Sequence, residues 1–405
     1  MAKLRRRRAL SAPGGPVASG GEATHARALA EALRVSTGDE TETRSLTHGF
    51  HSWPARFHPL LVRRLLADAT PGTTLCDPFV GSGTTLIEGA VAGLRGIGTD
   101  VNPLAVELTR LKATPLSAER RAALLAAARR AAEQSLARVK ARARTAGSGE
   151  RYDDPKQYAP HVFRELVGLR EEIGRAPPSE RRPLLLVLSS ILIKVSRTPS
   201  ETAAGSLERA VGKTLPTRLF LCRAEELDRQ LAAFAARVAA ATPPPEVRVA
   251  DARKLAHVPA ASVARILTSP PYLGTYDYAH QHERRLGWLE LDRGLVERAE
   301  SAEIGSRRRA QDPERALREW QADVDAFVAE FARVLQPAGR AYVVIGDSAV
   351  GSRSIAGDQA LRQAAERAGL AVVAWAHQER PSYYRPSGRD KRREHLLLLV
   401  KPSIS

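Results

Sequence analysis

Short apolar runs alternate with stretches of helical periodicity in two parts of the chain. Residues 73–77 and 95–100 are strand-length apolar runs, and each is followed by a turn and a helical stretch. This order is typical of a parallel β–α–β unit. Further strand-length runs lie at residues 247–251, 263–268, 340–346, 371–375 and 395–401. The pattern predicts an α/β fold with a Rossmann-like sheet of seven strands.

The last two of these strands have no helix between them. Because parallel strands need a long crossover, we expect these two to form an antiparallel hairpin at the edge of the sheet. The middle of the chain is rich in Ala, Arg and Leu with helical periodicity, which predicts a helical insertion. The expected parts are a flexible basic tail at 1–45 that runs into a short helix near 26–33, the first half of the α/β core at 46–116, the insertion at 117–240 and the second half of the core at 241–405.

The charge and the cysteine content of the chain limit the classes of protein to which it can belong. The 405 residues include 62 Lys and Arg against 45 Asp and Glu, a formal net charge of +17, which favours a polyanionic partner and nucleic acid first. The basic start of the chain fits a flexible arm better than an organelle-targeting peptide. The chain has 2 cysteines, too few for a disulfide scaffold, and no apolar run is long enough to span a bilayer. We expect a cytoplasmic protein without a membrane partner.

A glycine-rich turn follows the apolar run at 73–77. It reads Asp-Pro-Phe-Val-Gly-Ser-Gly-Thr-Thr from Asp77 to Thr85. Glycines let the backbone approach a ligand closely, and the N-terminus of the next helix offers free N–H donors. A second acid, Asp100, ends the next strand, where a carboxylate can bind the two hydroxyls of a ribose. Because no Lys follows the glycines, this is not a triphosphate-binding loop. A nucleoside-bearing cofactor without a triphosphate fits the pattern.

The tetrapeptide Ser269-Pro-Pro-Tyr272 follows the strand-length run at 263–268. Ligands of open α/β sheets bind at this end of the strands. Two prolines make a rigid turn without N–H donors, so carbonyl oxygens can act as acceptors beside the Ser269 hydroxyl. Acceptors together with the ring of Tyr272 suit a planar base that carries an exocyclic amine. Alone, the motif would be an ordinary Ser-Pro-Pro turn.

Together the two motifs resemble the amino-methyltransferases of nucleic acids, which use S-adenosylmethionine to methylate exocyclic nitrogens of cytosine or adenine. The resemblance covers about residues 46–116 and 245–401. In that family, Ser at the first position of the catalytic tetrapeptide goes mainly with N4-cytosine enzymes. The resemblance implies catalysis by Ser269, Pro270, Pro271 and Tyr272. It implies that S-adenosylmethionine is bound by Phe57, Asp77, Phe79, Gly81, Ser82, Gly83, Thr84, Asp100, Asn102 and Asp251.

The resemblance leaves the nucleic acid open, because no large target-recognition domain follows the last strand. We expect DNA with its target base flipped into the site, and the insertion and the segment 274–302 are the candidates for target recognition. The enzyme would act alone or beside a cognate restriction endonuclease. An amine in RNA, N6 of adenine in DNA, and a catalytically silent nucleic-acid-binding module are the alternatives. The candidate nucleic-acid contacts are Tyr276, Tyr278, Arg284, Arg389, Lys391 and Arg392.

Two other chemistries are not favoured. Methylation of carbon 5 of cytosine needs a thiol nucleophile, but Cys76 lies inside a predicted strand and Cys222 lies in the predicted insertion. His48, His51 and His58 form a loose cluster without a Cys or a carboxylate at ligand spacing. We therefore expect no metal site.

Overall fold

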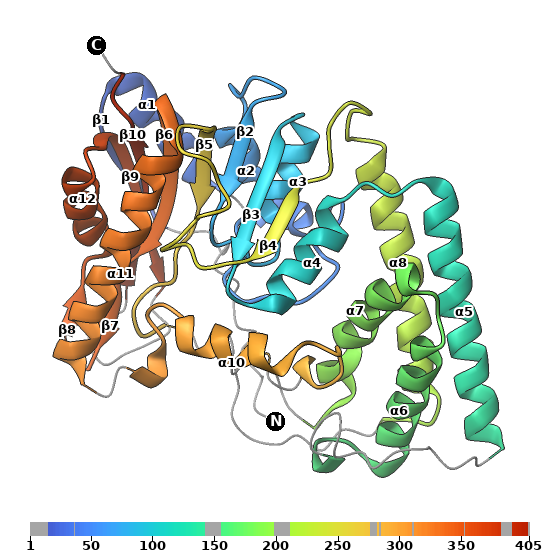
Figure 1. Ribbon diagram of the computed structural model, residues 1–405. Coiled ribbons are helices and arrows are strands. Elements are labelled where there is room, and N and C mark those ends of the chain that lie inside the picture. Colours follow the sequence, from blue (N-terminus) through green and yellow to red (C-terminus); the bar gives the residue numbers. More distant parts are fainter. Residues whose placement is uncertain are drawn as a thin grey trace.

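The computed structural model describes residues 15–35, 37–141, 155–197, 211–275, 282, 285–309, 312–351, 353–381 and 391–403 (Figure 1). Its centre is an eight-stranded sheet in the order β1-β9-β10-β6-β5-β2-β3-β4. Strands β6, β5, β2, β3 and β4 are parallel, β10 is antiparallel to β6 and β9, and β1 is antiparallel to β9. The strands are β1 (Val17–Gly21), β2 (Thr74–Asp77), β3 (Arg95–Asp100), β4 (Glu246–Val249), β5 (Val263–Thr268), β6 (Leu335–Gly346), β9 (Ala371–Pro381) and β10 (Lys391–Val400), beside a separate hairpin of β7 (Ser348–Val350) and β8 (Arg353–Ile355).

The α/β fold and the antiparallel pairing of β9 with β10 are confirmed, but the sheet has one strand more than the seven predicted. The additional strand is β1, which pairs along β9 and precedes α1 (Ala23–Leu33). The prediction of a flexible tail is therefore wrong for β1, whereas the short helix expected near 26–33 is present as α1. The strand is composed of Val, Ala, Ser and Gly, and glycine is depleted in strands, so the composition did not indicate it. A Cβ atom at Gly20 would lie only 2.7 Å from the ring of Trp375, which explains the small residue there.

Helices cover both faces of the sheet, because alternate side chains of each strand point to opposite faces. Val343 and Ile345 of β6 pack with α11 (Pro313–Val334) and α12 (Gly357–Arg367). Tyr342 and Val344 of the same strand pack with α1 and α2 (Pro59–Leu65). The remaining elements outside the helical insertion are α3 (Thr84–Val91), α4 (Pro103–Ala113), α10 (Arg293–Ala302) and the short 3₁₀ helices Thr37–Arg44 and Arg307–Arg309, and a further 3₁₀ helix, Pro155–Gln157, lies in the insertion.

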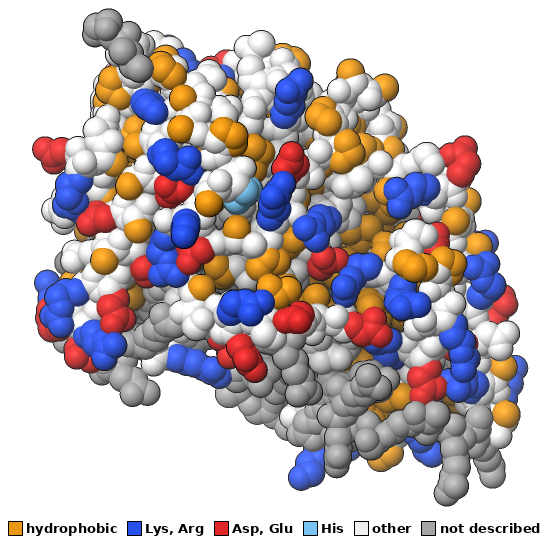
Figure 2. Space-filling view, in the orientation of Figure 1, with side chains coloured by type: hydrophobic (Ala, Val, Ile, Leu, Met, Phe, Trp, Pro, Cys, Tyr) orange, Lys and Arg blue, Asp and Glu red, His pale blue; other side chains and the backbone are white. Residues whose placement is uncertain are grey.

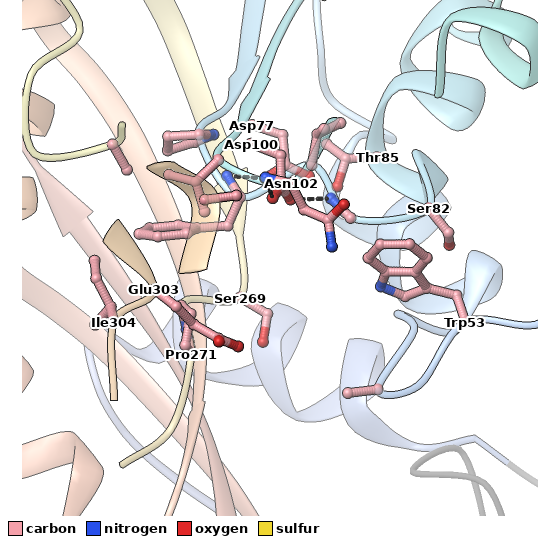
Figure 3. A pocket seen from close by; sticks show the side chains of 18 of the residues that line it. Trp53, Asp77, Ser82, Thr85, Asp100, Asn102, Ser269, Pro271, Glu303 and Ile304 are labelled. Atoms are coloured by element: carbon pink, nitrogen blue, oxygen red, sulfur yellow. Dashed lines mark hydrogen bonds between the residues drawn. The ribbon is translucent and has the colours of Figure 1, made fainter. Parts of the chain in front are cut away.

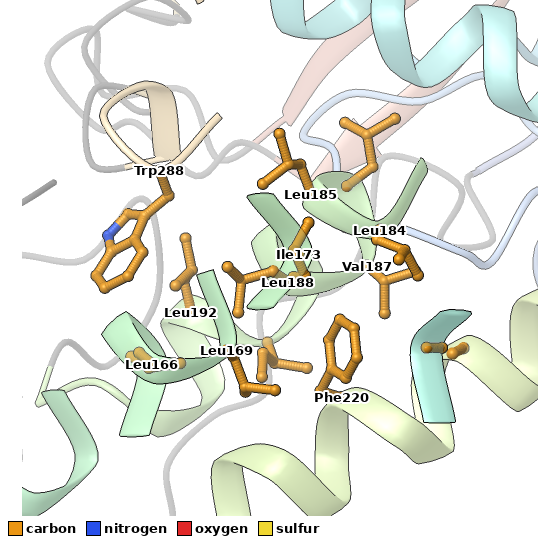
Figure 4. Close-up of a cluster of buried hydrophobic side chains, with 14 of the residues drawn as sticks. Leu166, Leu169, Ile173, Leu184, Leu185, Val187, Leu188, Leu192, Phe220 and Trp288 are labelled. Carbon is orange, nitrogen blue, oxygen red and sulfur yellow. The ribbon is translucent and has the colours of Figure 1, made fainter. Parts of the chain in front are cut away.

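The segment predicted as an insertion is helical. It contains α5 (Ala118–Lys140), α6 (Pro160–Gly174), α7 (Pro178–Val195) and α8 (Leu215–Ala235), which lie together at one end of the sheet (Figure 1). Leu169, Leu188 and Phe220 are fully buried between these helices (Figure 4). The same cluster includes Leu108 of α4 and Trp288, which follows the Ser-Pro-Pro-Tyr turn in the chain. The insertion therefore shares a hydrophobic core with both halves of the α/β part.

Among the described helices, none has both the length and the apolar character needed to cross a membrane.

Candidate active site

One pocket lies where β2, β3, β4 and β5 end. Asp77 ends β2 and Asp100 ends β3, whereas Asp251 and Ser269 follow β4 and β5, and all four line the pocket (Figure 3). The space between the lining residues is about 940 Å³, which includes the open mouth of the pocket. The fold thus brings together carboxylates and a hydroxyl that are up to 192 positions apart along the chain.

Most residues predicted to bind a cofactor are in this pocket. Gly83 is the exception: it does not appear among the lining residues and instead has a φ of +84° at the start of α3. A Cβ atom there would lie 2.8 Å from Thr109 of α4, so Gly83 allows the two helices to approach. Those that line the pocket are Phe57, Asp77, Phe79, Gly81, Ser82, Thr84, Asp100, Asn102 and Asp251.

Asp77 and Asp100 hold the glycine-rich turn in place. Asp77 Oδ1 accepts from the Thr268 hydroxyl at 2.6 Å and from the Phe79 N–H at 3.1 Å. Asp100 accepts the N–H of Gly81 through one oxygen and that of Asn102 through the other, both at 2.9 Å. Burial raises the pKa of each carboxyl to about 6, and the hydrogen bonds oppose this rise. Both acids therefore titrate close to neutral pH.

Asp251 forms an ion pair with Arg253 (Nη2 to Oδ2, 2.6 Å). The same guanidinium reaches Asp323 of α11 at 2.6 Å and donates to the Ala302 carbonyl at 3.2 Å. The hydrogen bond to Asp251 raises the pKa of Arg253 further above its ordinary value. Arg253, which the motifs did not indicate, thus joins Asp251 to α10 and α11.

A second wall of the pocket comes from the segment before the glycine-rich turn. Trp53, Arg56 and Phe57 line it, although only Phe57 was predicted. The Trp53 ring stacks on His282, with centroids 4.4 Å apart and planes at 28°. His282 Nδ1 lies 3.2 Å from Asn102 Nδ2, and burial lowers the pKa of His282 to about 3. A neutral imidazole therefore accepts from Asn102 and supports Trp53 from behind.

The Ser-Pro-Pro-Tyr turn is held rigidly. Ser269 and Pro271 line the pocket, whereas Pro270 and Tyr272 do not line it. The Pro271 carbonyl accepts the Trp320 indole N–H at 3.2 Å, and the Ser269 and Tyr272 oxygens are 3.4 Å apart. Gly346 at the end of β6 makes room for the Tyr272 ring, because a Cβ atom there would lie 2.6 Å from it.

The remaining wall comes from the end of the segment 274–302, which was expected only to take part in target recognition, and from the two residues after it. Ala299 and Ala302 of α10, followed by Glu303 and Ile304, close the pocket beside Ser269 (Figure 3). No motif marks this segment, and only the tertiary fold places it here.

Of the predicted nucleic-acid contacts, Tyr276, Tyr278, Arg284 and Arg389 lie outside the described residues. Lys391 and Arg392 begin β10. Because β10 is antiparallel to β6, its first residues lie at the sheet edge where β6 ends. This is also the edge that holds the pocket.

Neither cysteine is placed for nucleophilic catalysis. Cys76 is fully buried within β2, and burial raises the pKa of its thiol far above the ordinary value. Cys222 is exposed on α8, in the insertion. A thiol-based mechanism at this pocket therefore has no candidate among the described residues.

The three histidines near the pocket belong to separate hydrogen-bond networks. His48 Nε2 lies 2.9 Å from Glu88 Oε1, and His51 Nε2 lies 3.1 Å from the Ser189 hydroxyl. His58 caps the start of α2. Each ring is thus engaged by its own protein partner.

Comparison with known proteins finds methyltransferases, but only over parts of the chain. Residues 59–153, which include the glycine-rich turn and Asp100, match the family described as RMKL-like, methyltransferase domain. The type II methyltransferase M.MvaI of Kocuria varians is 42% identical over 80 residues, or 19% of this chain and 18% of that protein. M.MjaII of Methanocaldococcus jannaschii, also a type II methyltransferase, is 35% identical over 74 residues, 18% of this chain and 14% of the relative. The chain thus matches less than a fifth of the length of either curated relative.

Among solved structures, the rRNA methyltransferase aviRa from Streptomyces viridochromogenes covers 89% of this chain and 92% of its own, at 15% identity and a TM-score of 0.34.

Proposed function

We propose that this protein transfers a methyl group from S-adenosylmethionine to the exocyclic N4 of cytosine in DNA. The observation that carries the proposal is the single pocket that joins Asp77, Asp100 and Asp251 to Ser269. DNA as substrate is supported by the local similarity to two type II methyltransferases. Cytosine is supported by Ser at the first position of the tetrapeptide, and a restriction endonuclease would be the natural partner of such an enzyme.

The hydrogen-bond acceptors and aromatic rings of the pocket fit S-adenosylmethionine. Each oxygen of Asp100 accepts one backbone N–H and retains acceptor capacity for a ribose hydroxyl. Asp251 would accept from the adenine amine, while Trp53 and Phe57 would flank the methionine end. The cofactor would supply a methyl group on a positively charged sulfur, which an amine can accept without a covalent enzyme intermediate.

The catalytic turn would position the amine of the target base. Ser269 and the Pro270 carbonyl would accept its hydrogens and draw the nitrogen out of conjugation with the ring, so that its lone pair becomes available. The Pro271 carbonyl is less available to accept a hydrogen of the amine, because it already accepts the Trp320 indole N–H. The expected stacking of Tyr272 on the flipped base is carried by the family resemblance alone, because its ring is 8% exposed and does not line the pocket.

Transfer of a labelled methyl group tests the proposal. The purified protein is incubated with tritiated S-adenosylmethionine and, in parallel, unmethylated genomic DNA or total RNA. We expect label in DNA, and we expect Ser269→Ala to lower the single-turnover rate at least about tenfold while cofactor affinity stays within about twofold. Label in RNA alone would reassign the substrate, and equal rates for Ser269→Ala and the parent would contradict the proposed mechanism.

A further inference from the structure

Glu303 is a carboxylate of the pocket that the sequence motifs do not explain. It directly follows α10, is 8% exposed, and lines the same pocket as Ser269 and Pro271. In Figure 3 its carboxylate points toward the Ser269 hydroxyl, away from Asp100 and Asn102. Glu303 therefore lies on the side of the pocket where the proposed function places the target amine.

The backbone around Glu303 is anchored on both sides. Before it, the Ala302 carbonyl accepts from Arg253 at 3.2 Å. After it, the Gly305 carbonyl accepts the N–H of Gly274 at 2.8 Å. Gly274 lies two residues after Tyr272. The backbone of the segment that carries Glu303 is thus attached to the chain just after the catalytic turn.

The other acids of the pocket lie in the part where the proposed function places the cofactor. Asp77 and Asp100 hold the glycine-rich turn, and Asp251 is paired with Arg253. Glu303 comes from a different wall. Figure 3 shows its carboxylate directed at Ser269, whereas Asp77 and Asp100 lie farther along the pocket beside Asn102.

We propose that Glu303 is a further catalytic residue, which binds the exocyclic amine of the target base and accepts the proton that the amine loses. This inference rests on the proposed function. The nitrogen lone pair forms the bond to the methyl carbon as the carbon–sulfur bond breaks, and that electron pair stays on sulfur as a neutral thioether. One N–H bond of the positively charged nitrogen then breaks, its electrons return to nitrogen, and the proton passes to a carboxylate oxygen of Glu303.

Two physical reasons assign this step to a carboxylate. A neutral hydroxyl or carbonyl, as offered by Ser269 and Pro270, is too weak a base to accept the proton of the positively charged amine, whereas a carboxylate is basic enough to accept it. A buried negative charge also stabilises the positive charge that develops on nitrogen. Because a carboxylate has about four acceptor positions, contacts of Glu303 to the protein leave room for the amine.

The test compares Glu303→Gln with the parent protein. The variant keeps the shape of the side chain and one acceptor oxygen but cannot carry the negative charge or retain the proton. We expect the single-turnover rate of methyl transfer to genomic DNA to fall about a hundredfold. Affinities for S-adenosylmethionine, by calorimetry, and for DNA, by fluorescence anisotropy, should stay within about twofold. A rate equal to the parent's, or a loss of rate that matches a loss of cofactor affinity, would overturn the role of Glu303.

A second variant keeps the inference testable if Glu303→Gln folds poorly. Glu303→Ala with added sodium formate should regain activity as formate rises, because the small carboxylate can occupy the vacated space; a folded variant that formate does not restore contradicts the role. Glu300→Ala, at an exposed position of the same α10, is the matched control and should behave as the parent.

If the parent itself methylates no nucleic acid, the proposed function and this role are both wrong. If the parent is active and Glu303→Gln matches it, only the role of Glu303 is wrong.

Discussion

Asp100 combines a structural contact with a proposed binding contact. It accepts the N–H groups of Gly81 and Asn102, and burial raises its pKa to about 6. Ribose hydroxyls donate best to an ionised carboxylate, so cofactor binding would favour the ionised form. Affinity for S-adenosylmethionine should therefore rise with pH through about 6 and fall by up to about tenfold per unit below it. Calorimetric titrations from about pH 5 to about pH 8 measure this, and an affinity independent of pH would argue against the contact.

The variant Asp100→Ala removes both the structural contact and the proposed ribose contact, and the two losses are measured separately, as stability and as cofactor affinity. Charge-assisted hydrogen bonds contribute about 1.5–3 kcal/mol each, so this variant should bind S-adenosylmethionine at least about tenfold more weakly. The pH dependence should become smaller, with Asp77, whose pKa is also about 6, providing what remains. Thermal unfolding should show lower stability, because two backbone N–H groups lose their acceptor at about 1–3 kcal/mol each. An unchanged affinity in a folded variant would remove Asp100 from the site.

Residues within contiguous motifs could be predicted from the sequence, and those that arrive from elsewhere in the fold could not. Asp77, Asp100 and Ser269 stand at strand ends, where the α/β pattern itself predicts a site. Glu303 follows a helix without any motif, and His282 reaches the pocket only by stacking behind Trp53. Both residues reach the site through long-range packing, which leaves no periodic pattern in the sequence.

At the scale of elements, the docking of β1 on β9 depends on close backbone approach. Gly21 has a φ of +99°, and a Cβ atom there would lie 2.4 Å from the Val373 carbonyl oxygen. Gly21→Ala should therefore cost about 2–4 kcal/mol, as left-handed strain plus overpacking. Gly72→Ala is the matched control, because its φ is +81° with no atom within 4 Å, and should cost only about 1 kcal/mol. Urea unfolding measures both, and equal costs would contradict the docking of β1.

Hydrophobic periodicity predicted the elements that bury apolar side chains. The β6 run 341–345 alternates between two helical layers, and its apolar character is plain in the sequence. β1 was not predicted, because its small residues form no hydrophobic pattern in the sequence and instead leave room for the ring of Trp375. The extent of the helical insertion followed from composition, but its shared core with α4 and Trp288 did not.

At the scale of the whole molecule, the net charge of +17 suits a polyanion. Figure 2 shows Lys and Arg spread over the visible face and interspersed with acidic groups, so this face marks no single binding patch. Lys391 and Arg392 lie at the sheet edge that holds the pocket, and Arg389 precedes them in the chain. Changing all three to Ala should reduce the slope of log affinity against log salt for DNA by about two units, since each phosphate contact contributes about 0.7–0.9. A slope equal to the parent's would assign these residues to the solvated surface.

The central claim is that this pocket methylates N4 of cytosine, and the most direct test is the nucleoside content of DNA. Genomic DNA from cells that express the parent protein, and from cells that express Ser269→Ala, is digested to nucleosides and analysed by mass spectrometry. We predict N4-methylcytosine with the parent protein and little or none with Ser269→Ala. N6-methyladenine alone would contradict the choice of base, and DNA without any added methyl group would contradict the proposed activity on DNA.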